Sequence, residues 1–487
     1  MRFRSTAYPR RPLCAAVMLM ITALALPVSG LSDIRLPSLG DASSYDISPH
    51  EERQLGQAWL RSFRAQVDIL YDPLVQAYSE QLVQRMATYN PHLDNKHLTV
   101  VLVDNRQLNA FAVPGNIMGL NAGLFAFAPN EDEFASVVGH ELGHLSQHHF
   151  ARQQEAAEQM QLPMLATMLA GIVAASQGQA DAGVAAIASS QAAGIQNQLA
   201  YSRAYEKEAD RVGLDTLVRA GYDPGAMPRM FALMQRQVML NGGRAPEFLL
   251  THPLTESRIA DAEARADQLK PKAIAHGRDY PLVRARLIMH LESDPENALA
   301  RFLNAHADPI AQEYAKALKD LHQQHPQAAI QRLKALQQAH PTRLMINETL
   351  AEAYASAEHW DQASQQLEAL LDLSPDYYPA QFELAKVRLR QDRASDAEHL
   401  LQQLSQTRSQ DPHIWYQLAE TAGLAGDRVQ VHRARAEFFQ LTGRFKAALT
   451  QLDLALDKAD HYATKAAVRE RRAELVDMRQ QFHDLMR

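Results

Sequence analysis

The chain has 487 residues, of which 46% are hydrophobic and 22% charged. These proportions are ordinary for globular proteins and exclude a wholly disordered chain. The net charge of −7 argues against a protein that embraces nucleic acid. The length allows two or three domains, and abundant Ala, Leu and Gln favour a mainly helical fold.

The first thirty residues predict a signal peptide. Four arginines among the first eleven residues precede an apolar stretch from Leu13 to Val28, and small residues follow at 28–30. The stretch is shorter than the ~20 residues of a spanning helix, so an uncleaved membrane anchor is the weaker alternative. Cleavage would remove Cys14, the only cysteine. A secreted chain without thiols suits the periplasm.

The next 90 residues predict helices followed by a small β-structure. Residues 31–47 form a loose leading segment rich in Ser, Asp and Pro. Apolar residues recur with helical spacing from Pro49 to Asn90. Leu98–Val103 is a β-branched run, and Ala110–Leu120 contains a Pro-Gly turn flanked by apolar residues. We therefore expect short strands in both segments.

A long helical pattern, Glu131–Gln154, carries the motif H-E-L-G-H at 140–144. Histidines four residues apart lie on one helix face, so the imidazoles of His140 and His144 can reach one metal ion. Glu141 directly follows the first histidine, which suits a general base that is not itself a ligand. We expect His148, His149 and the remaining histidines to be structural or at the surface.

An apolar segment follows this helix. Residues 159–180 contain no charged residue, and Leu162–Ala175 is strongly apolar. It is too short for a spanning helix and contains Pro163 near its start. Three interpretations of residues 159–200 stay open: buried core helices, a cover over the active site, or peripheral contact with a membrane.

A second polar motif supplies a candidate for the third ligand. The extended motif H-E-x-x-H-x-x-G-x-x-H is absent, because Gln147 and Phe150 stand where its Gly and His would be. The sequence E-K-E-A-D at 206–210 places Glu206 and Asp210 on one helical face. Glu206 can bind the metal while Asp210 lies one turn away.

The C-terminal part predicts tetratricopeptide repeats. Small and leucine residues recur with a period of 34: Ala329, Ala363 and Ala397; Leu333, Leu367 and Leu401; Leu336, Leu370 and Leu404. This period is typical of stacked helical hairpins whose concave face binds other polypeptides. After Leu418 the pattern continues half a repeat out of phase, so we expect a divergent last repeat and a capping helix through Arg487.

The two motifs together resemble peptidase family M48, a gluzincin-type group of zinc metallopeptidases. The resemblance implies that the first Glu of the second motif, Glu206 rather than Glu208, is the third zinc ligand. It makes Asp210 an acid of the catalytic site that orients a ligand or donates a proton. It also implies that an edge strand within Ala110–Leu120 can hold an extended substrate. His252-Pro253 matches a motif that can fill the fourth position of zinc and keep such enzymes latent.

The layout resembles periplasmic members of that family. We expect a signal peptide at 1–30, a gluzincin-type domain with a small β-sheet at 31–270, connecting helices at 271–305 and an α-solenoid of repeats at 306–487. The resemblance implies a periplasmic endopeptidase with one zinc ion per chain that degrades misassembled outer-membrane β-barrel proteins. Its repeats would bind the β-barrel assembly machinery. The alternative is a chaperone-like assembly factor whose proteolysis is latent or secondary.

Overall fold

The structure is a computed structural model that describes residues 49–93, 96–153, 202–269 and 277–485. The predicted signal peptide and the apolar segment 159–200 lie outside the described residues. The described part is mainly helical, with one small sheet, as the composition predicts. Among these residues, no helix combines the length and the apolar content that a membrane crossing requires.

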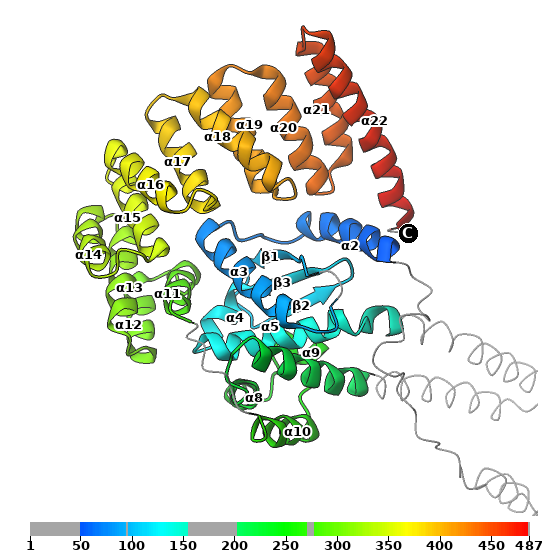
Figure 1. Cartoon of the computed structure of the whole chain (residues 1–487), viewed down its shortest axis with the longest axis vertical. Coiled ribbons are helices and arrows are strands. Elements are labelled where there is room, and N and C mark those ends of the chain that lie inside the picture. The colour runs from blue at the N-terminus through cyan, green and yellow to red at the C-terminus, as the bar shows by residue number, and fades with distance from the viewer. Residues whose placement is uncertain (1–48, 94–95, 154–201, 270–276, 486–487) are drawn as a thin grey trace, which may run out of the picture. The chain divides into compact units, whose positions relative to one another are not determined.

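The first part of the chain surrounds a three-stranded sheet with helices (Figure 1). Residues 149–153 and 202–219 are also helical. The remaining elements are α2 Pro49–Arg64, α3 Pro73–Tyr89, β1 Thr99–Val103, β2 Ala110–Val113, β3 Ile117–Asn121, α4 Ala122–Phe127, α5 Glu131–Ser146, α8 Ala226–Leu240, α9 Glu247–Thr251 and α10 Glu256–Ala266.

The sheet has the order β1-β3-β2, so the predicted strands form and β2 lies at an edge. β3 pairs in parallel with β1 and antiparallel with β2. The predicted Pro-Gly turn connects β2 to β3, and Gly115 adopts a φ of 82°, which a residue without Cβ tolerates. β3 is buried along its whole length. The sheet therefore forms part of the core of this region, with α5 packed beside β2.

The long helix predicted for Glu131–Gln154 is interrupted. α5 ends at Ser146, and its C-cap is Gln147. His148 has a φ of 49°, which lies in the left-handed region and cannot continue a right-handed helix. The helical residues 149–153 therefore start in a new direction. The prediction of one continuous helix was wrong at this point.

Two connecting helices, α11 Tyr280–Leu291 and α12 Pro295–Ala305, precede the repeats. Most residues of α11 are buried. The Tyr280 hydroxyl donates to the carbonyl oxygens of Phe125 and Ala128, and Arg284 donates to that of Ala126. These bonds satisfy carbonyl groups at the end of α4 that have no partner within the helix. α11 also packs on α13, so it belongs to the core of both regions.

The C-terminal half is a stack of helices in chain order (Figure 1). The leucines and alanines of the 34-residue pattern are all buried between neighbouring helices. This burial confirms the predicted repeats. The last helix exposes most of its surface, as a capping helix should. The elements are α13 Pro309–His322, α14 Pro326–Ala339, α15 Leu344–Ser356, α16 Trp360–Leu373, α17 Tyr378–Arg390, α18 Ala394–Thr407, α19 Pro412–Ala425, α20 Arg428–Leu441, α21 Phe445–Lys458 and α22 Tyr462–Leu485.

Candidate functional site

The site is built where α5 and helix 202–219 pack with their backbones in close contact. A Cβ atom at Gly139 would lie 2.9 Å from the carbonyl oxygen of Gly213, and one at Gly143 would lie 2.6 Å from that of Ala209. Real Cβ atoms do not approach backbone oxygens so closely, so a side chain at Gly143 would push the helices apart. The glycine inside the H-E-L-G-H motif thus brings the second motif within reach of the histidines.

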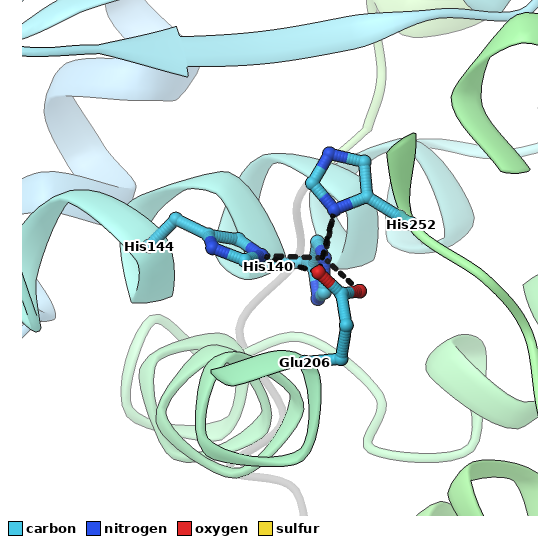
Figure 2. Close-up of side chains that lie close together, drawn as sticks. All are labelled: His140, His144, Glu206 and His252. Atoms are coloured by element: carbon cyan, nitrogen blue, oxygen red, sulfur yellow. Dashed lines mark hydrogen bonds and ion pairs between the residues drawn. The ribbon is translucent and has the colours of Figure 1, made fainter. Parts of the chain in front are cut away.

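Four side chains converge at this contact, as Figure 2 shows. Nε2 of His140 lies 3.1 Å from Nε2 of His144, 3.5 Å from Oε2 of Glu206 and 3.3 Å from Nδ1 of His252. Oε1 of Glu206 lies 3.3 Å from Nε2 of His144 and 3.0 Å from Nδ1 of His252. One donor atom from each residue lies within 4.8 Å of the other three. The structure therefore groups all four residues that the sequence singled out as ligands.

The donor set of this cluster fits a divalent cation such as zinc. Three imidazole nitrogens and a carboxylate are ligands that zinc prefers, in tetrahedral arrangement. With bonds of about 2.0–2.2 Å, the ligand atoms of such a site lie about 3.3–3.6 Å apart. The close pairs of donor atoms here are separated by 3.0–3.5 Å. Most pairs of these side chains are therefore spaced close to what a tetrahedral metal site requires, and one atom from each residue lies within 4.8 Å of the other three.

The other ring nitrogen of His140 contacts Asp210. Nδ1 of His140 lies 2.9 Å from Oδ1 of Asp210. Burial lowers the pKa of His140, but its hydrogen bonds to Asp210 and Glu206 outweigh burial and raise this pKa to about 10. In the neutral ring, which is the form that binds a metal ion, the Nδ1–H group donates to Asp210 and the lone pair of Nε2 faces the cluster. The position of Asp210 is thus that of a group that orients His140.

Arg258 lies beneath the two acidic residues and was not predicted as part of the site. Its Nε lies 2.6 Å from Oδ2 of Asp210, and its Nη1 lies 2.8 Å from Oε2 of Glu206. Burial raises the pKa of Asp210, but hydrogen bonds from Arg258 and His140 outweigh it and lower this pKa. Two buried acids on one helix face require a cation. That requirement is a signal in the sequence that could have indicated a nearby cation, although it does not identify Arg258.

Glu141 is buried beside the cluster without belonging to it. Its side chain is 1% exposed, and its Oε1 lies 3.7 Å from Nε2 of His252. Burial raises the pKa of Glu141, against the lowering effect of His252 and His140. Oε1 has no hydrogen-bond partner among the described residues. A carboxyl group with a raised pKa is well suited to take up a proton and release it again.

A cleft of about 480 Å³ opens onto these residues. Its walls include Glu141, His144 and His252, and on one side Phe111, Ala112 and Val113 of β2. Within the described parts of the chain, β2 pairs with a single strand, β3. An edge strand beside a cleft presents backbone groups to which an extended peptide can hydrogen-bond. The geometry therefore suits a polypeptide ligand.

Three neighbouring polar residues lie outside the cluster. Glu208, which the sequence offered as an alternative to Glu206, contacts His149 and Arg152 instead. His148 lies 3.4 Å from the carboxylate of Glu52 on α2. His149 is buried, at 4% exposure, so of the two expected roles it has the structural one. The structure thus brings Glu206 to the other ligand candidates and holds Glu208 away from them.

Comparisons with known proteins agree with this geometry. Residues 73–266 match the model of peptidase family M48, and residues 365–421 match a tetratricopeptide-repeat model. A putative beta-barrel assembly-enhancing protease of Vibrio cholerae is 32% identical over 450 residues, which are 91% of this chain and 92% of the relative. The beta-barrel assembly-enhancing protease of Escherichia coli K12 is 29% identical over 86% of both chains.

Another relative is similar over less than half of the chain. The mitochondrial metalloendopeptidase OMA1 of Arabidopsis thaliana is 26% identical over 233 residues, which are 45% of this chain and 42% of the relative. The Vibrio and Escherichia relatives, by contrast, extend through the peptidase region and the repeats. The chain therefore belongs to metallopeptidase family M48, in the group of the beta-barrel assembly-enhancing proteases.

Proposed function

We propose that this chain is a zinc-dependent endopeptidase of the periplasm that degrades misassembled outer-membrane β-barrel proteins. The observation that carries the proposal is the cluster of His140, His144, Glu206 and His252 beside a cleft with an edge strand. The names of the Vibrio and Escherichia relatives support the link to β-barrel assembly. The four arginines and apolar stretch of residues 1–30 support export from the cytoplasm.

His140, His144 and Glu206 would hold one zinc ion per chain. A zinc ion bound there would act as a Lewis acid on the attacking water and on the scissile carbonyl group. Glu141 takes the proton of the water molecule and delivers it to the leaving amine, for which its raised pKa is suited. Asp210 keeps His140 in place through Nδ1, and Arg258 keeps Asp210 and Glu206 in place in turn.

His252 would be the fourth ligand in a resting state. It is the C-cap of α9 and lies between α9 and α10, on a connection outside the two helices that supply the other proposed ligands. Its Nδ1 is 3.0–3.3 Å from the donor atoms of Glu206 and His140. A zinc site with four protein ligands is closed, whereas a catalytic site keeps a position open. The loop would therefore keep the enzyme latent until it moves away.

The repeats would recruit the chain to its substrates. We retain the proposed limits of the signal peptide (1–30), the peptidase domain (31–270), the connecting helices (271–305) and the repeat domain (306–487). Stacked helical repeats present a concave surface to other polypeptides, and residues 365–421 match such a repeat model. The partner that we propose for this surface is the β-barrel assembly machinery.

A Glu141→Gln variant tests the enzymatic function against the chaperone-like alternative. Glutamine has the same shape but cannot accept the proton of water, so casein cleavage by the purified chain should fall at least about 100-fold, with zinc content unchanged. Assembly of outer-membrane proteins in cells that carry only this variant is the second measurement. Full assembly without proteolysis would show that the chaperone-like activity is the principal one. Undiminished casein cleavage would contradict the role of Glu141.

A further inference from the structure

A chain of polar contacts runs from His144 away from the metal cluster. Nδ1 of His144, the ring nitrogen that faces away from the cluster, lies 3.0 Å from Nδ1 of His149. Nε2 of His149 lies 3.1 Å from Oε2 of Glu208. The same carboxylate oxygen lies 2.9 Å from Nη1 of Arg152. Four side chains are thus connected in series, beginning at a proposed ligand.

The Glu208 carboxylate determines which ring nitrogens of His149 and His144 carry a proton. The Glu208 carboxylate, which already accepts from Arg152, can only accept, so Nε2 of His149 carries a proton. In a neutral imidazole the other nitrogen is then an acceptor, and Nδ1 of His144 must donate to it. This arrangement leaves Nε2 of His144 without a proton. Its lone pair points toward His140 and Glu206, where a cation needs it.

Packing fixes the His149 ring in the orientation that this requires. His149 is 4% exposed, and its ring stacks on that of Tyr205 with centroids 4.6 Å apart and planes inclined by 20°. The guanidinium group of Arg152 lies over the same tyrosine ring, 4.7 Å from its centroid. The left-handed residue His148 makes the arrangement possible. In an uninterrupted helix, residues five apart point in different directions and could not meet ring to ring.

We propose that His149 and Glu208 are positioning residues that fix the tautomer and the ring orientation of His144 for metal binding. His149 acts directly on His144, and Glu208 acts through His149. Asp210 holds His140 in the same way, so each histidine of the H-E-L-G-H motif has a partner on its outer nitrogen. This inference rests on the metal site proposed above. Loss of such a partner typically lowers metal affinity or activity 10–100-fold.

The test compares variants that separate the hydrogen bond from the packing. His149→Phe keeps a ring to stack on Tyr205 but has no acceptor, and His149→Asn keeps an acceptor close to the place of Nδ1. The zinc dissociation constant of each full-length mature chain is measured by competition with a chromophoric chelator. We expect His149→Phe to weaken zinc binding about 10–100-fold and His149→Asn to recover part of that loss. The thermal midpoint of each chelator-treated variant shows whether the fold persists.

The second arm tests whether Glu208 works through His149. Glu208→Ala should weaken zinc binding in the wild-type background and have no further effect when His149 is already phenylalanine. Asp215→Ala, an exposed acid on the same helix, is the matched control and should leave affinity unchanged. Equal zinc affinity of wild type and His149→Phe would overturn the positioning role. Additive effects of Glu208→Ala and His149→Phe would also overturn it, and neither result would affect the proposed metal site. A wild-type chain without affinity for zinc would overturn the metal site and this inference with it.

Discussion

Nδ1 of His252 lies 3.0 Å from Oε1 of Glu206, and the same oxygen lies 3.3 Å from Nε2 of His144. His252 arrives from the connection between α9 and α10, whereas the other members of the cluster come from two helices in fixed contact. The cluster therefore combines three donors on two closely packed helices with one donor on the connection between α9 and α10. This asymmetry is the basis of the proposed latency.

Replacing His252 by alanine should activate the enzyme. His252→Ala opens the fourth position, so basal casein cleavage and self-cleavage should rise at least several-fold while zinc remains bound by three ligands. Rates are compared at equal zinc content. His290→Ala, an exposed histidine outside the cleft, is the control. If turnover slows instead, His252 works in catalysis as a donor to the developing oxyanion. That result would refute the proposal that His252 keeps the enzyme latent.

Arg258 should matter for stability far more than a neighbouring arginine on α10. Arg258→Gln leaves Asp210 and Glu206 buried without their cation, which should lower the free energy of unfolding by about 3 kcal/mol or more. Arg265→Gln removes an exposed pair with Asp261 and should cost less than about 1 kcal/mol. Urea denaturation of chelator-treated protein measures both. Equal losses would contradict the structural role that we assign to Arg258.

The connecting helix α11 should be needed by the peptidase domain. A fragment that ends at Lys270 lacks Tyr280 and Arg284, which satisfy the carbonyl groups of α4. Each buried apolar side chain of α11 contributes about 1.5–3 kcal/mol. The fragment should therefore unfold at least about 10 °C below one that ends at His306. Thermal unfolding of the two zinc-loaded fragments tests this, and identical midpoints would show that α11 belongs to the repeats alone.

Glu348 should make the repeat domain less stable as the pH rises. Burial, with the charges of Glu352 and Glu383 nearby, raises the pKa of Glu348 well above its usual range. The folded chain therefore keeps a proton that the unfolded chain loses above a pH of about 4.5, so stability falls as the pH rises beyond that value. The contribution of this group to stability is fully present below that pH.

A Glu348→Gln variant removes this dependence. The variant should gain stability relative to wild type as the pH rises from 5 to 8, at up to about 1.4 kcal/mol per pH unit. Urea denaturation at several pH values measures the difference between the two chains. A difference that stays constant with pH would mean that Glu348 is ionised in the folded chain.

The repeats were predictable because their sequence signal is redundant. Ala363 and Leu367 recur one period before and one period after, and each copy is buried in the same way. The interruption at His148 has no such signal, since Gln147 and His148 are compatible with a helix by composition. The contacts of His149 with His144 and Tyr205, which the interruption allows, are tertiary and become visible only in the structure.

The candidate site also contains residues that the sequence predicts and residues that only the structure reveals. His140, Glu141 and His144 follow from helical spacing, because residues within one helix have a known separation. The choice of Glu206 over Glu208 depended on the family resemblance. The roles of Arg258 and His149 could be identified only from the structure. Their contacts depend on how close two helices approach, which Gly139 and Gly143 decide. A sequence motif shows that a glycine is present but not which backbone it faces.

Metal content tests the central claim most directly. The mature chain, purified and then dialysed against metal-free buffer, should retain about one zinc ion, as measured by mass spectrometry of the metal. Glu206→Ala should lose most of it, as should His140→Ala and His144→Ala, since each removes one of the three ligands that we propose. Glu208→Ala should lose much less zinc than these three variants, because Glu208 contacts His149 and not the cluster and weakens zinc binding only through that histidine. Full zinc in Glu206→Ala together with loss of zinc in Glu208→Ala would contradict the account.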